Sequence, residues 1–426
     1  MRAADLTPVA AAAQTQSGWD LFLVFAAANI VATTLQVGAA LGDVASSATM
    51  AGVVAVGAAA GAGLVAALAP IGSRLGVPSM IAARAVLGHT GAGVVAAVLF
   101  VTNFAWIAVN NVIAASVCAR LVPLPFGERA WAIGLGLVSA AVVARGPGAV
   151  RRADRWAVPL MLAAGLVITW AVLALPASPA PDGPAAAPPG LVAWPRLLDV
   201  VIGYQVSWLL MFADYSRFTR GPRTSAWAVF LGLGLTALWL MPLGWRLARH
   251  AGSADPGAML AAADVGVLAA ALITLATITT NFVNIYLSSL AWRSVMPSVP
   301  DRTAVWTVGL VGTALGAASG AGLDRFAGLM TVVGSVLVPV GGVLLAHFVI
   351  ARRATAVADL YDARGPLGGV RWPGLAAWGG GIAVYYAVPA LLPGTGATVP
   401  SLATAVALYL LLDRPERRAG PGRRDA

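Results

Sequence analysis

Apolar stretches long enough to cross a bilayer recur along the whole chain, and short breaks that carry Arg or Pro separate them. A helix of about 20 apolar residues spans the hydrocarbon core of a membrane. The pattern therefore predicts an all-α integral membrane protein with twelve transmembrane helices. The predicted spans are residues 19–41, 48–70, 91–119, 130–144, 156–175, 197–216, 225–245, 264–291, 303–323, 326–351, 374–392 and 398–412.

The span predicted at 264–291 departs from this pattern in its middle. Between Ile273 and Leu290 it carries a block of polar side chains that includes Thr277, Thr279, Thr280, Asn281, Asn284, Tyr286, Ser288 and Ser289. A polar group in hydrocarbon raises the free energy unless a specific partner pairs with it. The block therefore predicts the lining of an internal binding site, and it favours a membrane transporter.

Composition supports a single membrane domain. Hydrophobic residues make up 59% of the 426 positions and charged residues only 10%, which is untypical of soluble domains. The predicted transmembrane domain covers residues 19–412, between an N-terminal tail (1–18) without the features of a cleavable signal and an Arg-rich tail (413–426). The Pro-rich stretch 176–195 is predicted to be a surface loop, because helical sequence resumes after it.

The distribution of positive charge predicts the orientation. All 27 residues counted as Lys or Arg are Arg. If the N-terminus is cytoplasmic, 21 of the 27 Arg fall in cytoplasmic loops and tails, which is where membrane proteins retain positive charge. The prediction is a multi-pass protein with both termini inside. The absence of Lys together with many Ala, Gly and Arg residues indicates a GC-rich bacterial genome, so the expected location is a bacterial cytoplasmic (inner) membrane. The net charge of +10 then reflects topology, so no nucleic-acid partner is expected.

The sequence gives little support to an enzyme or a channel function. Cys118 is the only cysteine, and His89, His250 and His347 lie in different segments without the paired spacing of a metal site. No grouping of Ser, His and Asp suggests an activated nucleophile. A channel would present a continuous polar stripe along several helices, whereas the polarity here is confined to the middle of the spans. A transporter that is not an enzyme and has no cofactor is therefore expected.

The central polar groups are mostly neutral hydroxyls and amides. Proton-driven carriers often keep an ionisable group within a span, so this chemistry favours Na⁺ as the coupling ion, with H⁺ as the alternative. Thr279 and Thr280 can supply two hard oxygen ligands, and backbone carbonyls at an unwound helix can supply the others. The competing interpretation is that each Thr bonds back to its own helix.

Several separated motifs resemble the nucleobase:cation symporter-1 family, in particular its cytosine permease branch. The resemblance extends over the first ten predicted helices. It is carried by the stretch from Trp19 to Arg84, by Ala83, Arg84, Gly88 and Gly91, by Asn103 and Trp106, by Gly203 to Phe218 with its run Ala213-Asp214-Tyr215-Ser216-Arg217-Phe218, and by Thr279-Thr280-Asn281 followed by Tyr286.

The resemblance implies a fold of two inverted five-helix repeats, about 19–175 and 197–351, with two extra helices at about 374–412. The first helix of each repeat, helices 1 and 6, would be broken near the middle of the membrane, with substrate and ion beside the breaks. Span six offers Gly203, Tyr204, Gln205 and Ser207 as a break. Span one offers Ala26 to Asn29, without the Gly pair typical of the branch.

The resemblance also implies the ligands. Na⁺ would bind the carbonyls of Ala26, Asn29 and Ala276 and the hydroxyls of Thr279 and Thr280. The substrate, a small heterocycle, would stack on Trp106 beside Asn103, with Asn281 and Gln205 reading its polar edge. Three further residues, Tyr204, Ser207 and Ile30, complete the expected substrate site. Asp214 and Arg217 are expected to form an interfacial ion pair or part of an inner gate.

The expected activity is import of a pyrimidine-type nucleobase or related heterocycle by cation symport and alternating access. Asn103 stands where the branch commonly has Gln, and Val283 occupies a position that is usually polar. These departures count against cytosine itself. The pair Ser207-Trp208 and the run from Asp214 to Phe218 are similar to the subgroup thought to carry hydroxymethylpyrimidine. That substrate is therefore slightly favoured over cytosine, and a purine, allantoin or hydantoin remains an alternative. The resemblance requires no oligomer, since a monomer is sufficient.

Overall fold

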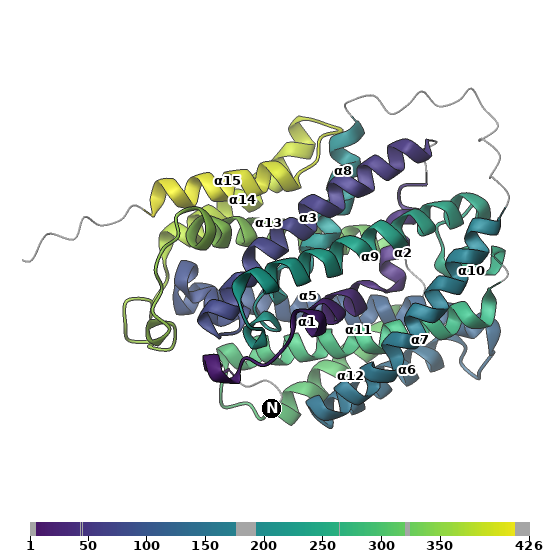
Figure 1. The fold of residues 1–426 in the computed structure, drawn as a ribbon, viewed down its shortest axis with the longest axis horizontal. Helices are drawn as coiled ribbons and strands as arrows, with labels where there is room; N and C mark the ends of the chain where they lie inside the picture. Colours follow the sequence, from purple (N-terminus) through teal and green to yellow (C-terminus); the bar gives the residue numbers. More distant parts are fainter. Residues whose placement is uncertain are drawn as a thin grey trace, which may run out of the picture.

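The chain folds into a bundle of helices. The structure is a computed structural model that describes residues 6–42, 44, 46–175, 193–263, 265–319 and 324–413. All the regular secondary structure in these residues is helical. Figure 1 shows α14 and α15 together at one edge of the bundle, with α6, α7 and α12 toward the opposite edge and α1 between them. Most of the Arg-rich tail and of the Pro-rich loop lies outside the described residues.

Each of the twelve predicted segments contains helix, although not every segment is one long helix and two short helices, α4 and α10, lie between segments. Seven helices are long and apolar enough to cross a membrane, or eight if the bent pair α1 and α2 counts as one span. Among the remainder, α6, α8 and α15 are shorter and α12 does not meet the same criterion. The described helices are α1 (Gly18–Asn29), α2 (Ala32–Ala39), α3 (Ser47–Leu75), α4 (Ser79–Ala82), α5 (Arg84–Leu121), α6 (Glu128–Ala144), α7 (Pro147–Ala174), α8 (Ala193–Val206), α9 (Pro222–Ala251), α10 (Pro256–Ala262), α11 (Gly266–Val295), α12 (Asp301–Ser319), α13 (Asp324–Leu344), α14 (Trp372–Leu391) and α15 (Thr398–Leu412).

The first predicted span is broken. A capping box between Ser17 and Asp20 starts α1, and the helix ends at Asn29. Val31 is extended, with φ −144° and ψ 157°, so the backbone leaves the helical path before α2 begins. The two helices are bent by 58°. The last carbonyls of α1 consequently have no partners further along the same helix, and they lie inside the protein because Asn29 is fully buried.

The sixth predicted span also ends early. The helix α8 stops at Val206, and two short 3₁₀ turns follow at Leu209–Met211 and Ser216–Phe218. The backbone between Ser207 and Phe218 is therefore not a continuous α-helix. Irregular backbone at membrane depth is tolerated where it is buried in protein or lines a cavity, and most of the side chains in this stretch are buried.

Two reciprocal glycines bring the broken first span against α9. A Cβ atom at Gly38 of α2 would overlap the backbone carbonyl of Met241 in α9. A Cβ atom at Gly244 of α9 would in turn overlap the carbonyl of Leu35 in α2. Small residues at such crossings let helix backbones approach closely in membranes. In the same way α3 packs along α9, and α5 packs along α11.

Candidate functional site

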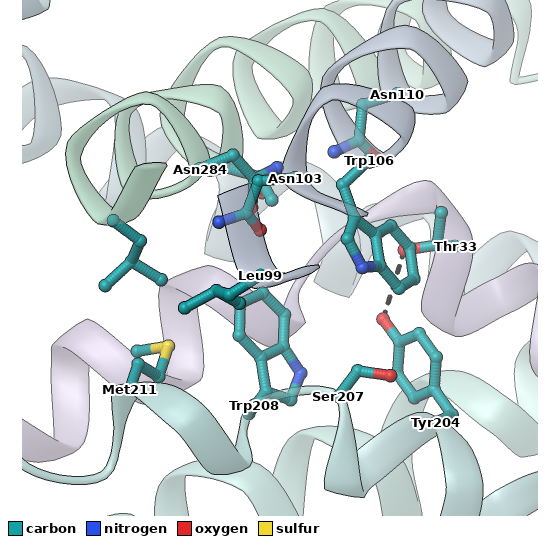
Figure 2. Close-up of a pocket in the computed structure, with 12 residues that line it drawn as sticks. Thr33, Leu99, Asn103, Trp106, Asn110, Tyr204, Ser207, Trp208, Met211 and Asn284 are labelled. Carbon is teal, nitrogen blue, oxygen red and sulfur yellow. Dashed lines mark hydrogen bonds between the residues drawn. The ribbon is translucent and has the colours of Figure 1, made fainter. Parts of the chain in front are cut away.

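A cavity lies where the two helix breaks face α5 and α11 (Figure 2). It is lined by side chains from four separate parts of the chain. These are Thr33 from α2, Leu99, Asn103, Trp106 and Asn110 from α5, Tyr204, Ser207, Trp208 and Met211 around the end of α8, and Thr280, Asn284 and Leu287 from α11. Five of them, Asn103, Trp106, Tyr204, Ser207 and Thr280, are among the residues that the sequence proposed for substrate or cation.

Helical spacing explains which residues of α5 and α11 reach the cavity. On α5 the polar and aromatic positions Asn103, Trp106 and Asn110 are three and four residues apart, so they share one face of the helix. Thr280 and Asn284 on α11 are also four apart. The polar block of α11 turns inward rather than toward lipid, because Thr280 and Asn284 are 3% and 4% exposed.

Two indole rings border the cavity (Figure 2). Trp106 comes from the middle of α5, and Trp208 comes from the first turn after α8. The sequence analysis assigned only Trp106 to the substrate. The signal for Trp208 was its place beside a predicted helix break, since residues just beyond such a break are directed toward the binding site. Flat aromatic ligands stack on indoles, at about 1 to 3 kcal/mol per stacked base.

Several polar atoms of the cavity residues have no hydrogen-bond partner within the described part of the chain. They are Nδ2 of Asn103, Oδ1 of Asn110, Oγ1 of Thr280 and Nδ2 of Asn284, all buried. An unsatisfied buried polar group costs about 1 to 3 kcal/mol. A bound ligand or ion that pairs with these atoms would recover that free energy. The site therefore offers both donors and acceptors to a polar heterocycle.

Tyr204 connects the two breaks beside the cavity. Its hydroxyl lies 3.1 Å from the hydroxyl of Thr33 and 2.7 Å from that of Thr34. The Tyr204 ring belongs to the last turn of α8 and both threonines to the first turn of α2. These contacts therefore link the end of α8 to the start of α2.

Asn29 forms a second connection, at the end of α1. Its Nδ2 donates to the carbonyl of Leu233 at 3.2 Å and to Oγ1 of Thr236 at 2.8 Å, both on α9. Its Oδ1 accepts a hydrogen bond of 3.2 Å from Nε1 of Trp208. Sequence analysis proposed Asn29 only for its backbone carbonyl, so the role of its side chain was missed.

Three of the proposed substrate residues lie outside the cavity. Gln205 is fully buried, and its Nε2 donates to the carbonyl of Leu233 at 3.0 Å. Asn281 faces α5, where its Nδ2 donates to Oδ1 of Asn111 at 2.9 Å. Ile30 packs in an apolar cluster with residues of α5, α7 and α11. In each case the helix turn that carries the residue directs it at a neighbouring helix, which residue type alone does not reveal.

The proposed Na⁺ ligands lie on two helices that are in contact, α1 and α11. Oγ1 of Thr280 is buried without a partner and borders the cavity. Oγ1 of Thr279 instead donates to the carbonyl of Ala276 at 3.1 Å. The Asn29 carbonyl accepts from Oγ1 of Thr34 at 2.5 Å, and the Ala26 carbonyl accepts from the amide of Ile30 at 2.9 Å. These are neutral, hard oxygen atoms of the kind that Na⁺ prefers.

Asp214 lies between the two 3₁₀ turns and Arg217 lies within the second, and both side chains are buried. The carboxylate of Asp214 accepts from the amide of Ser79 at 3.3 Å, and the Ser79 hydroxyl accepts from the amide of Ala213 at 3.0 Å. Arg217 donates to the hydroxyl of Tyr286 at 3.4 Å, and its guanidinium lies 4.7 Å from the ring centre of Phe218. The two residues thus tie the segment after α8 to α4 and α11.

The cavity is narrow in this conformation. Its volume is about 30 Å³, enough for about two water molecules. A heterocycle must therefore displace lining side chains or meet a more open state. A narrow cavity between helix breaks is consistent with a protein that changes conformation around its ligand.

Comparison with known proteins agrees with this arrangement. Residues 8–410 match the family described as permease for cytosine/purines, uracil, thiamine, allantoin. Mhp1, a nucleobase-cation-symport-1 family transporter, has a similar fold in its closed conformation with bromovinylhydantoin bound. The TM-score is 0.80 and the identity 18%, over 96% of this chain and 94% of Mhp1. Its inward-facing conformation gives a TM-score of 0.78 and 18% identity over 95% and 92% of the two chains.

More distant comparisons point to the same fold. A Na⁺-coupled sialic acid symporter in a substrate-bound outward-open state has a TM-score of 0.62 and 10% identity, over 94% of this chain and 90% of that one. A comparison with curated protein sequences found no match. The family match covers nearly the whole described chain, and the fold and the cavity between helix breaks accord with it. The chain therefore belongs to the family of permeases for cytosine/purines, uracil, thiamine, allantoin, as a multi-pass membrane protein.

Proposed function

We propose that the protein is a secondary transporter, not an enzyme, which imports a pyrimidine-type nucleobase or related heterocycle by symport with a cation. The observation that carries this proposal is the cavity itself. Two indoles and four buried polar atoms without partners among the described residues converge there from three parts of the chain. A flat ring would stack on the indoles, and its polar edge would pair with the unsatisfied atoms.

Na⁺ is the proposed coupling ion. The proposal rests on the neutral oxygen atoms at the end of α1 and on α11, and on the buried hydroxyl of Thr280 that has no partner in the described residues. A cation there would hold α1 against α11 and favour the outward-open state that accepts substrate. The membrane potential adds about 2.3 kcal/mol per charge per 100 mV to the driving force for uptake. Coupling to H⁺ is the alternative.

Hydroxymethylpyrimidine and cytosine are the proposed substrates, with a purine, allantoin or hydantoin as alternatives from the same family. The cavity offers donors at Asn103 and Asn284 and an acceptor at Asn110. An aminopyrimidine presents ring nitrogens as acceptors and an amino group as donor, so it can pair with both kinds of atom. We further propose that the twelve helical segments form two inverted five-helix repeats plus two helices, in a bacterial inner membrane with both termini cytoplasmic.

A thermal-shift screen tests this function. Purified protein would be heated with cytosine, hydroxymethylpyrimidine, uracil, hypoxanthine, allantoin or hydantoin, each in NaCl and in KCl. A ligand that binds only the folded state raises the apparent melting temperature. We expect at least one of these heterocycles to stabilise the protein, and more strongly in NaCl. Stabilisation by none of them would contradict the proposed substrate class, and equal stabilisation in both salts would contradict Na⁺ coupling.

A further inference from the structure

We propose that Asn29 couples the cation to the substrate cavity. Its backbone carbonyl is one of the proposed cation ligands, and its side chain holds the Trp208 indole that borders the cavity. The inference rests on the proposed function, because it requires a cation at the end of α1. It assigns to Asn29 the role of a positioning residue, which acts on the substrate through Trp208.

The side chain of Asn29 has a single defined orientation. Its Oδ1 faces the indole N–H of Trp208, and its Nδ2 faces the carbonyl of Leu233. An indole N–H can only donate and a main-chain carbonyl can only accept, so exchange of the amide oxygen and nitrogen would break both bonds. Asn29 is 0% exposed, and water therefore does not compete for these bonds. The position of the Trp208 ring is tied to that of Asn29.

The main chain of Asn29 provides a second link to the same cavity. Its carbonyl accepts a hydrogen bond of 2.5 Å from the hydroxyl of Thr34, which lies 2.7 Å from the hydroxyl of Tyr204. A cation that binds this carbonyl competes with Thr34 for its lone pairs. The Thr34 hydroxyl is then freer to donate to Tyr204. One peptide unit at the end of α1 is thus connected to two cavity residues, Trp208 and Tyr204.

A physical consequence follows for binding. A cation that attracts the carbonyls of Ala26 and Asn29 orders the last turn of α1, and the hydrogen bond from Trp208 extends that order to the indole. A heterocycle that stacks on an ordered ring loses less conformational entropy than one that must order the ring itself. The cation and the heterocycle therefore strengthen each other's binding, typically by about 5- to 150-fold in coupled sites of this kind.

Fluorine NMR of the full-length protein, labelled with 5-fluorotryptophan, tests this link with Na⁺ as the only probe. Trp208→Phe assigns the Trp208 signal by deleting it. Trp378→Phe assigns a control, because the Trp378 indole donates to the carbonyl of Val336 at 3.0 Å in α13, away from the cavity. Spectra in NaCl and KCl would be compared for the unsubstituted protein and for two variants, Asn29→Leu and the smaller change Asn29→Ser. One of the two variants suffices if the other does not fold.

We expect NaCl to shift the Trp208 signal in the unsubstituted protein and to leave the Trp378 signal unmoved. In the Asn29 variants we expect NaCl to cause no shift of the Trp208 signal. A Trp208 shift that persists in those variants overturns the inference. The inference is also overturned if NaCl stabilises the unsubstituted protein against heating but does not move its Trp208 signal. In that case the proposed cation binding still stands. No stabilisation by NaCl at all overturns both the cation proposal and the role of Asn29.

Discussion

The hydroxyl oxygens of Tyr204 and Thr34 lie 2.7 Å apart, and this contact joins the end of α8 to the start of α2. Both helices end or begin at a break, so each has backbone that its own helix does not restrain. The contact is buried, because Tyr204 is 2% exposed and Thr34 fully buried. It therefore fixes the two breaks relative to each other on one side of the cavity.

Replacement of Tyr204 tests the importance of this contact. Tyr204→Phe removes the hydroxyl and leaves those of Thr33 and Thr34 without that partner. We expect a loss of about 1 to 3 kcal/mol in stability, because the buried Thr33 hydroxyl loses its partner among the described residues, while that of Thr34 keeps the carbonyl of Asn29. Apparent melting temperature in detergent measures it. Tyr386→Phe is the control, since the Tyr386 hydroxyl pairs with Ser335 at 3.1 Å and the residue is 51% exposed. An equal loss in both variants would contradict the special role of Tyr204.

Trp106 is expected to provide the main stacking surface for the heterocycle. Loss of one stacked base contact corresponds to about 1 to 3 kcal/mol, or roughly 5- to 150-fold in affinity. Trp106→Ala should therefore weaken the binding of every heterocycle that stabilises the unsubstituted protein by at least this factor, as followed by calorimetry. Trp227→Ala is the matched control, because Trp227 is 63% exposed on the outer surface of α9. Unchanged affinity in Trp106→Ala would remove this residue from the site.

Thr280 is expected to act on the cation. Its hydroxyl is buried without a partner among the described residues, so removal of the hydroxyl breaks no hydrogen bond to those residues. Thr280→Ala should therefore retain a near-normal melting temperature. The Na⁺ concentration needed for half-maximal heterocycle binding should rise at least about tenfold, which is equivalent to about 1.4 kcal/mol. The Na⁺ dependence should change less in a variant of the aromatic site that still binds, such as Trp106→Phe. Identical Na⁺ curves in the two variants would contradict the assignment.

The packing of α2 against α9 is expected to tolerate no added carbon. In Gly244→Ala the new methyl group would overlap the carbonyl of Leu35, so the two backbones must separate. Overpacking of this kind typically costs about 1 to 3 kcal/mol. Gly134→Ala on the exposed side of α6 meets no atom within 4 Å and serves as the control. If Gly244→Ala melts at the same temperature as Gly134→Ala, the close approach of α2 and α9 does not contribute to stability.

Much of the fold follows from the sequence, since apolar periodicity locates helices well. Each predicted segment contains helix, and the break in span one lies directly after Asn29. The number of helices that cross the membrane in one piece follows less directly from the sequence. α8 ends at Val206 although apolar residues continue to Phe212, because hydropathy reports burial in an apolar environment and not whether the backbone stays helical.

The site was predictable in its location and less so in its members. Polar residues inside an apolar span indicate an interior, but they do not tell a ligand from a neighbouring helix. Asn281 and Asn284 lie on the same polar block of α11, yet Asn281 bonds to Asn111 while Asn284 borders the cavity. Three residues along a helix rotate a side chain by about 60° from its starting direction, and only the packing of α5 on α11 decides which direction meets the cavity.

Uptake into proteoliposomes most directly tests whether this cavity carries a heterocycle together with a cation. Labelled heterocycle identified in the thermal-shift screen would be supplied outside, with an inward Na⁺ gradient or with none. We predict saturable accumulation of chemically unchanged label that requires the gradient and is strongly reduced in Trp106→Ala. Accumulation that is indifferent to Na⁺, that never saturates, or that is undiminished in Trp106→Ala would contradict the account.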